Sequence, residues 1–161
     1  MKVRLIEDQD AAATLRIHNH FVTETTVTFD LEARSLSEQI AWIQAHRGAH
    51  PAVVALLDDE VIGYGSLSGF RPRPAYNTTV EDSVYVDPAH HGNGAGLALL
   101  TRLCELAAEY GYHSVIARIT GHNEASLALH QRCGFALVGI EREIGRKHQQ
   151  WLDVAEMQLL I

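Results

Sequence analysis

The chain of 161 residues has few cysteines, few prolines, no long apolar run and a shortage of basic residues. Its two cysteines, Cys104 and Cys133, lie in helical patterns and are too few for a disulfide framework, so we expect reduced, buried thiols. The 13 Lys and Arg residues are outnumbered by 20 Asp and Glu residues, and the net charge of −7 disfavours binding to nucleic acid. No apolar run approaches the roughly 18 residues of a membrane-spanning helix. Charges within residues 1–8 stand where a secretory apolar core would lie, so we expect a cytoplasmic protein without membrane contact.

The remaining composition is that of a globular protein, with 47% hydrophobic and 20% charged residues. A chain of this length buries enough surface to fold without a disulfide or metal staple, and we expect one domain over residues 1–161. The 10 histidines show none of the paired spacings that zinc sites require, so no metal is expected.

The pattern of apolar residues predicts strands and helices in the order β-α-α-β-β-β-α-β-α-β-β. This order predicts a mixed α/β sheet with one right-handed strand–helix–strand unit at residues 80–120. In the helix of that unit we expect Leu97, Leu100, Cys104 and Ala107 to face inward. The expected strands cover residues 3–6, 52–57, 61–67, 80–86 and 113–120 and two segments after Gly134. The other expected helices cover residues 10–22, a segment opened by the capping box Ser35–Glu38, and residues 123–133. Residues 23–34 and 69–77 are expected loops.

A cluster of glycines at residues 92–96 separates the strand that ends at Val86 from the long helix. Glycines let backbone N–H groups approach a ligand, and a helix N-terminus adds positive potential, so the arrangement is typical of a phosphate site. A phosphate-loop nucleotidase needs Lys and Ser or Thr after the last glycine, and a dinucleotide fold needs glycine where Leu97 stands. The pattern that fits is Arg or Gln, two free residues, Gly, one free residue, then Gly or Ala, with His91 in first place. A glycine-rich turn without a ligand is the alternative.

On this motif the chain resembles the GNAT superfamily of N-acetyltransferases, whose acetyl-CoA pyrophosphate loop has the same form and position. Residues 76–86, 123–130 and 151–154, with residues 19–20 near the start, are similar to its phosphinothricin and methionine sulfoximine acetyltransferase branch. The resemblance covers almost the whole chain and departs at His91, where the family usually has Gln or Arg. It implies an α/β fold with a mixed, mostly antiparallel sheet whose fourth and fifth strands splay apart, flanked by helices. We also expect a homodimer.

The resemblance implies that acetyl-CoA, as co-substrate and without a metal, lies in the gap between the splayed strands. Strand backbone would pair with the pantetheine arm as an added strand does, and the glycine loop would hold the pyrophosphate. Asn123 would hydrogen-bond the pantetheine or thioester end, although it suits the role of helix N-cap equally well. The implied cofactor-binding residues are Val84, Tyr85, Val86, His91, Gly92, Asn93, Gly94, Ala95, Gly96, Leu97 and Asn123.

Two titratable residues are catalytic candidates for the proton transfers that acetylation requires. An amine must lose a proton before it attacks, and a departing thiolate must gain one. Glu81 precedes the cofactor segment and faces the opposite side of its strand from Asp82, and the resembling branch has its proposed base at the matching Glu. His130 follows Asn123 by nearly two helical turns and faces the cleft if Asn123 does. A surface carboxylate and a core-edge histidine are the alternatives.

A loop before the Glu81 strand carries two arginines stiffened by prolines. Guanidinium groups bind carboxylates and phosphinates in two-pronged fashion, so Arg71 and Arg73 suit such an acceptor, with Tyr76 as a wall. In the resembling branch this loop lines the amino-acid pocket, and Phe29 matches an aromatic residue of that pocket. A solvated basic loop is the alternative.

The prediction is therefore an acetyl-CoA-dependent N-acetyltransferase that acts by direct transfer with general-base help. Its small-molecule acceptor would be the α-amine of an amino acid of the phosphinothricin, methionine sulfoximine or methionine sulfone type. One alternative keeps the chemistry but takes a protein N-terminus, an aminoglycoside or a polyamine; the two arginines count against the cationic acceptors. Another is a non-catalytic acyl-CoA-binding module, in which Glu81 and His130 are idle.

Overall fold

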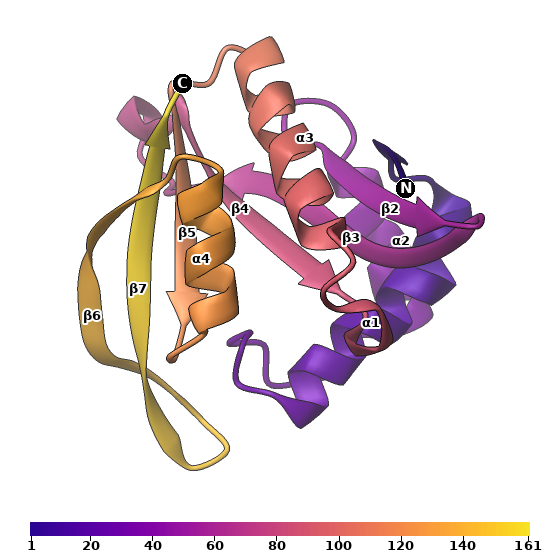
Figure 1. Cartoon of the computed structure of the whole chain (residues 1–161), viewed down its shortest axis with the longest axis horizontal. Helices are drawn as coiled ribbons and strands as arrows, with labels where there is room; N and C mark the ends of the chain where they lie inside the picture. Colours follow the sequence, from indigo (N-terminus) through magenta and orange to yellow (C-terminus); the bar gives the residue numbers. More distant parts are fainter.

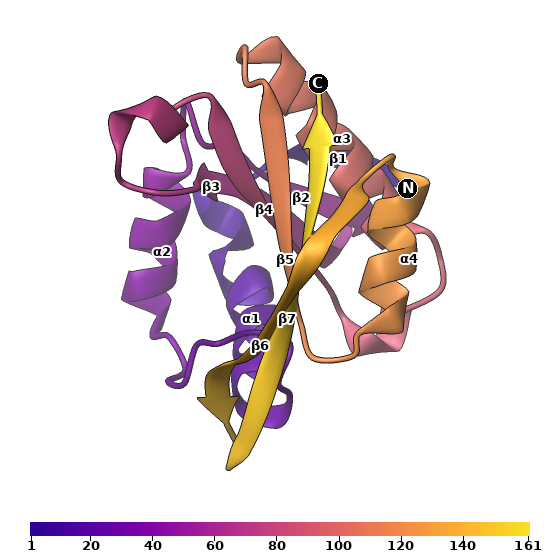
Figure 2. The ribbon, with the colours of Figure 1, turned by 90° about the vertical axis from the view of Figure 1, so that its left-hand side faces the viewer.

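The computed structural model describes residues 1–161 and places them in one seven-stranded sheet with helices on both faces (Figures 1 and 2). The strand order is β1-β2-β3-β4-β5-β7-β6, and every neighbouring pair is antiparallel except β4 and β5. The predicted mixed, mostly antiparallel sheet is thus confirmed. The strands are β1 (Lys2–Leu5), β2 (Ala52–Leu57), β3 (Glu60–Gly69), β4 (Thr79–Val86), β5 (Ser114–Thr120), β6 (Ala136–Lys147) and β7 (Gln150–Leu160).

Four helices cover the sheet, two on each face, as Figure 2 shows. Helices α1 and α2 lie on one face, and α3 and α4 lie on the other. The predicted capping box opens α2, because the Ser35 hydroxyl accepts from the Glu38 N–H and the Glu38 carboxylate accepts from the Ser35 N–H. No helix has both the length and the apolar character needed to cross a membrane. The helices are α1 (Ala11–Glu24), α2 (Leu36–Ala45), α3 (Ala95–Glu109) and α4 (Glu124–Arg132), and short 3₁₀ turns cover Asp8–Asp10, Pro74–Tyr76 and Pro88–His90.

Each face of the sheet has its own hydrophobic core, and β2 contributes to both. Val53 packs toward α3, whereas its neighbour Val54 packs toward α1 and α2, because successive strand residues point to opposite faces. This explains why β2 is a continuous apolar run rather than an alternating one.

The buried stripe of α3 differs from the predicted one. Leu100 and Ala107 are buried as expected, but Leu97 and Cys104 are only half-buried. The prediction was wrong for Leu97, which lines a cavity beside α4, whereas Cys104 packs against the core although part of it stays accessible. Leu99, Leu103 and Leu106 complete the buried stripe.

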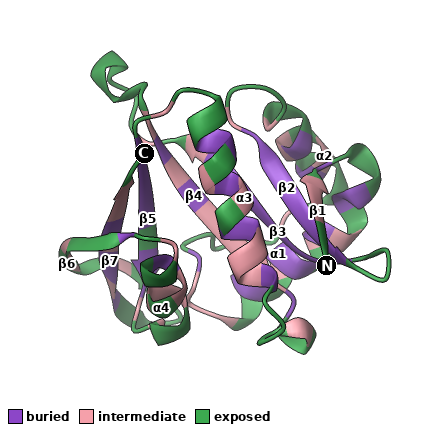
Figure 3. Cartoon of the chain, turned by 45° about the horizontal axis from the view of Figure 1, so that its top comes forward, coloured by how far each residue is buried: buried purple, intermediate pink, exposed green.

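Strand β6 forms an edge of the sheet and is mostly exposed (Figure 3). Several large apolar side chains project from it into solvent, which is unusual for an edge strand. More than half of the accessible surface remains exposed at Leu137, Val138, Ile140 and Ile144, and at Trp151 on β7.

Candidate functional site

Strands β4 and β5 separate part-way along their length. Their parallel pairing runs from Thr79 opposite Ser114 to Asp82 opposite Ala117 and then ends, while β3 stays paired with β4 as far as Val86. The β5-facing backbone groups of residues 83–86 therefore have no strand partner. The predicted splay of these strands is confirmed.

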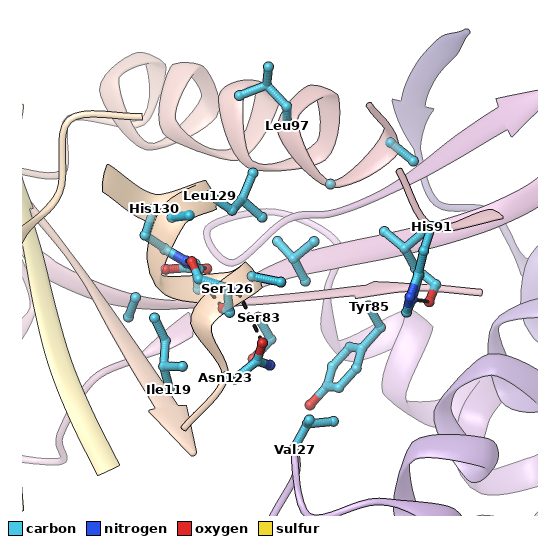
Figure 4. Close-up of a pocket in the computed structure, with 18 of the residues that line it drawn as sticks. Val27, Ser83, Tyr85, His91, Leu97, Ile119, Asn123, Ser126, Leu129 and His130 are labelled. Atoms are coloured by element: carbon cyan, nitrogen blue, oxygen red, sulfur yellow. Dashed lines mark hydrogen bonds and ion pairs between the residues drawn. The ribbon is translucent and has the colours of Figure 1, made fainter. Parts of the chain in front are cut away.

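A cavity of about 520 Å³ occupies this gap and extends between α3 and α4 (Figure 4). It brings together every residue that the sequence predicted to bind the cofactor, from Val84 through the glycine loop to Asn123. Phe21 and Val27 close it from the α1 side. The wall is therefore assembled from segments that are far apart in the sequence.

The glycine loop is shaped by left-handed backbone at Gly92 (φ +80°) and Gly94 (φ +89°). Gly94 is the N-cap of α3 and provides no capping side chain, so N–H groups of the first turn remain without an intrahelical acceptor. These groups, with the positive end of the helix dipole, form a site for an anion such as a pyrophosphate. The exposed His91 ring lies with Nε2 2.9 Å from the Val86 carbonyl oxygen, so one of its nitrogens is occupied by the protein.

Asn123 caps α4, since its Oδ1 accepts from the Ser126 N–H at 3.1 Å. Figure 4 shows the amide nitrogen of Asn123 on the side away from Ser126. The capping role is therefore real, and it leaves the amide nitrogen available to a ligand in the cavity.

His130 is buried in the wall behind Asn123 and forms an ion pair with Asp82, which the sequence analysis did not foresee. Its Nε2 lies 3.1 Å from Asp82 Oδ2, and its Nδ1 lies 2.7 Å from the Ser126 carbonyl oxygen. Burial is the largest single influence on the pKa of His130 and lowers it. The hydrogen bond to Asp82, the negative charge of Asp82 and the Ser126 carbonyl together outweigh burial, so the pKa is raised above 6.5. The alternation of Glu81 and Asp82 was the available signal, since it sends Asp82 to the α4 face.

A second, more polar cavity of about 350 Å³ lies on the α1 and α2 side of β4. Its lining includes Glu81 and Phe29, both predicted site residues, together with Asp30, Arg34 and Arg118. Val27, Ser83, Tyr85, Arg118 and Thr120 line both cavities. The two cavities therefore meet where β4 and β5 separate.

Glu81 is half-buried in this second cavity. Burial raises its pKa; Arg118 opposes the shift and the nearby charge of Asp82 adds to it, so the net pKa is above 4.5. A carboxylate with a raised pKa is a better proton acceptor near neutral pH than an exposed one.

Arg71, Arg73 and Tyr76 of the predicted acceptor loop do not line either cavity. All three are exposed, because the prolines and the 3₁₀ turn hold the loop at the surface. The Arg71 guanidinium stacks over Phe70 at 4.8 Å, and its charge lowers the pKa of Glu81 only weakly.

Arg34, like Arg118, is a cavity-lining cation that the sequence did not predict. Its guanidinium makes only long hydrogen bonds, at 3.3 Å, to Asp30 and Gln39. The signal that points to it is its position next to the capping box of α2, which fixes the end of the preceding loop.

Comparison with known proteins adds a family match and full-length relatives. The Acetyltransferase (GNAT) family model matches residues 14–135. The chain is 38% identical to the L-amino acid N-acyltransferase MnaT of Escherichia coli (strain K12), covering 99% of this chain and 93% of that protein. It is 36% identical to an L-methionine sulfoximine/L-methionine sulfone acetyltransferase of Salmonella typhimurium, covering 99% of this chain and 94% of that protein.

A solved structure shows the same architecture. The phosphinothricin acetyltransferase of Sinorhizobium meliloti, in complex with acetyl-CoA, superposes with a TM-score of 0.95 at 36% identity, covering 99% of this chain and 88% of that chain.

Proposed function

Because the chain belongs to the acetyltransferase (GNAT) family and is an acyltransferase that uses acetyl-CoA, we propose that it acetylates the α-amine of a small amino-acid-like acceptor. The acceptor would be of the phosphinothricin, methionine sulfoximine or methionine sulfone type. The observation that carries this proposal is the meeting of two unlike cavities at the splay of β4 and β5. One is built from backbone and glycines, and the other is lined by charged side chains.

The first cavity has the features that acetyl-CoA needs. The first turn of α3 offers N–H donors for the pyrophosphate, the unpaired edge of β4 offers backbone groups for the pantetheine arm, and Asn123 offers its amide nitrogen. Bound acetyl-CoA supplies an activated acetyl group. The protein then has to remove a proton from the amine and return one to the leaving group.

Glu81 is proposed as the base, because it is the half-buried carboxylate where the second cavity adjoins the first. Its raised pKa suits it to accept a proton from an ammonium group. Arg34 and Arg118 are proposed to hold the acceptor's carboxylate in place of Arg71 and Arg73, because only the former pair lines the cavity. Cations and carboxylates in one small cavity favour a zwitterion over a polyamine.

A panel of amines assayed for release of CoA thiol tests the proposal. Phosphinothricin, methionine sulfoximine and methionine sulfone should be turned over, whereas spermidine, an aminoglycoside and a peptide with a free N-terminus should be poor acceptors. Arg34→Met should raise KM for the amino acid by about tenfold or more and leave KM for acetyl-CoA unchanged, since a charge-assisted bond contributes about 1.5–3 kcal/mol. Preference for the peptide or for spermidine contradicts the acceptor class, and acetyl-CoA binding without any turnover indicates a binding module.

We propose that a second copy of the chain covers β6. We also propose a cytoplasmic location, because the unpaired cysteines Cys104 and Cys133 would stay reduced there. An edge strand with four exposed aliphatic side chains, Leu137, Val138, Ile140 and Ile144, is an aggregation site unless another surface covers it. Light scattering after size exclusion should give a dimer, and Ile140→Lys should give a monomer. A monomeric wild type contradicts the proposed dimer.

A further inference from the structure

Both ring nitrogens of His130 face groups that accept hydrogen bonds. A carbonyl oxygen only accepts, so the 2.7 Å contact with the Ser126 carbonyl requires a hydrogen on Nδ1. On the other side Nε2 lies 3.1 Å from Asp82 Oδ2, so either Nε2 also carries a hydrogen or the Asp82 carboxyl does. In either arrangement the pair holds one proton more than a neutral imidazole beside a carboxylate.

The pair is closed off from solvent. The side chains of His130 and Asp82 are only 5% and 1% exposed, and the Phe135 ring packs edge-on against the imidazole at 5.0 Å. The titratable groups around it are Glu81, next to Asp82 on β4, and the thiols of Cys104 on α3 and Cys133 at the end of α4. Burial is the main cause that raises the pKa of each of the three. Asp82 is therefore the charged partner that the ring contacts directly.

The hydroxyl of Ser126 connects this buried proton to the first cavity. Ser126 Oγ lies 3.4 Å from His130 Nδ1, and Ser126 lines the cavity. Figure 4 shows Ser126 on the cavity side of His130, between the ring and Asn123. The ring cannot turn toward the cavity without losing both of its present partners.

We propose that Ser126 is the terminal proton donor of the acetyl transfer and that the His130–Asp82 pair resupplies its proton. This inference rests on the proposed function. The proton on Ser126 Oγ moves to a thiolate sulfur in the first cavity, and the proton on His130 Nδ1 moves to Ser126 Oγ. His130 is left neutral with a hydrogen on Nε2 donated to the Asp82 carboxylate, so one S–H bond forms and one N–H bond breaks.

The relay assigns different roles to its three members. All three residues line the cavity, but both ring nitrogens of His130 are engaged by the Ser126 carbonyl and Asp82, so Ser126 is the catalytic residue whose hydroxyl meets the thiolate. His130 and Asp82 are positioning residues that hold the proton and act through Ser126. A purely structural role, in which the His130 bond to the Ser126 carbonyl only fixes a turn of α4, would leave the hydroxyl without any part in the reaction.

The kinetic test removes only the hydroxyl. Ser126→Ala keeps the backbone carbonyl that His130 contacts, and it should lower kcat by about 10²-fold, the lower range for one acid–base group. The affinity for acetyl-CoA, measured by calorimetry, should stay near that of the wild type. Ser126→Thr restores a hydroxyl and should recover most of the rate. A wild-type kcat in Ser126→Ala, or no recovery in Ser126→Thr, would overturn the relay.

The second readout needs no turnover. Nitrogen NMR of the ¹⁵N-histidine-labelled protein, with the His130 signals assigned by their loss in His130→Gln, should show hydrogens on both ring nitrogens at neutral pH. Ser126→Ala should keep this signature. A ring with a single hydrogen and an ionised Asp82 overturns the relay even if amines are acetylated. If no amine is acetylated by the wild type, the proposed function fails and the relay fails with it, whereas a fast Ser126→Ala enzyme refutes the relay alone.

Discussion

Two buried histidines lie on opposite faces of the sheet and have pKa values shifted in opposite directions. His18, on α1 beside the acceptor cavity, is 2% exposed, and its pKa is lowered to about 4 by burial, with the charge of Arg34 adding to the effect. His130, on α4 beside the cofactor cavity, is 4% exposed, and its pKa is raised. Burial of the residue is nearly equal, so the partners decide the difference. Both imidazoles lie near a carboxylate, since His18 Nε2 is 3.2 Å from Asp30 Oδ2 and His130 Nε2 is 3.1 Å from Asp82 Oδ2. The charges of Arg34 and Lys147 oppose Asp30 beside His18, whose Nδ1 also contacts the Tyr64 hydroxyl at 2.9 Å, whereas no cation offsets Asp82 beside His130.

The binding sites on the two faces of the sheet are also built from different kinds of group. The cofactor face is built from backbone groups whose positions depend on a few φ angles, while the acceptor face is built from side chains whose charges depend on one another. The cofactor face should therefore be most sensitive to changes of conformation, and the acceptor face to changes of charge.

Gly94→Val should have the largest effect, because it acts on the backbone of the cofactor face. Gly94 has a φ of +89°, which a β-branched residue adopts only at a large cost, so the N–H groups of the first α3 turn should lose their present direction. Calorimetry should detect no acetyl-CoA binding. Gly111→Val is the matched control, since Gly111 has a φ of +80° just after the other end of α3 and lies outside both cavities. It should lose stability but still bind acetyl-CoA.

Glu81→Gln should have the next largest effect, on the acceptor face. It keeps the size of the side chain but removes the proton acceptor, so kcat near pH 7 should fall by about 10²–10⁴ with acetyl-CoA affinity unchanged. The wild-type rate should rise with pH as Glu81 ionises, with a midpoint above its ordinary pKa of 4.5 because burial raises it. The Gln variant should lack that step and recover part of its rate at high pH, where the amine loses its proton unaided.

Glu109→Gln is the control for this variant, because Glu109 is an exposed partner of Arg102 at the far end of α3. Exposed ion pairs contribute little, so its kcat should match that of the wild type. Equal rates in Glu81→Gln and Glu109→Gln would refute the base assignment.

The cofactor face could be predicted from the sequence because its signal is local. A strand, a glycine run and a helix start within residues 84–97 specify both the motif and its shape, and all of the predicted cofactor residues line one cavity. The acceptor face could be predicted only in part, because Glu81 and Phe29 were predicted site residues, whereas Arg34 and Arg118 reach this cavity only through the tertiary fold. Arg71 and Arg73 are near Glu81 in sequence, but the structure places both at the surface and outside the two cavities. Strand alternation predicted that Asp82 and Glu81 point to opposite faces of the sheet, but it did not identify His130 as the partner of Asp82.

Asp82→Asn should shift the pKa of His130 in the same direction as that of His18. Without the carboxylate, burial should dominate and move the pKa of His130 below 6.5, which a histidine NMR titration measures directly. In the wild type the raised pKa contributes stability that is fully present below about pH 6.5 and is lost as pH rises through the folded-state value. The stability difference between wild type and variant should therefore be largest at mildly acidic pH and shrink as pH rises. His18 should keep its pKa of about 4 in both proteins; a raised pKa of His130 in Asp82→Asn would contradict this account.

Tyr64→Phe should have the smallest effect, and it tests the neutral member of the comparison. The change deletes the hydroxyl that bonds His18 Nδ1 at 2.9 Å and keeps the ring that stacks on Tyr85 at 5.2 Å, so packing of the acceptor face should persist. Because a buried ring nitrogen loses its partner, the free energy of unfolding in urea near pH 7 should fall by about 1–3 kcal/mol. Tyr110→Phe is the control, since Tyr110 is 48% exposed, and it should change stability by less than about 0.5 kcal/mol. The pKa of His18 should remain below 6.5 in Tyr64→Phe, because burial is the larger cause of its shift. A rise toward 6.5 would show that the hydroxyl, rather than burial, keeps this histidine neutral.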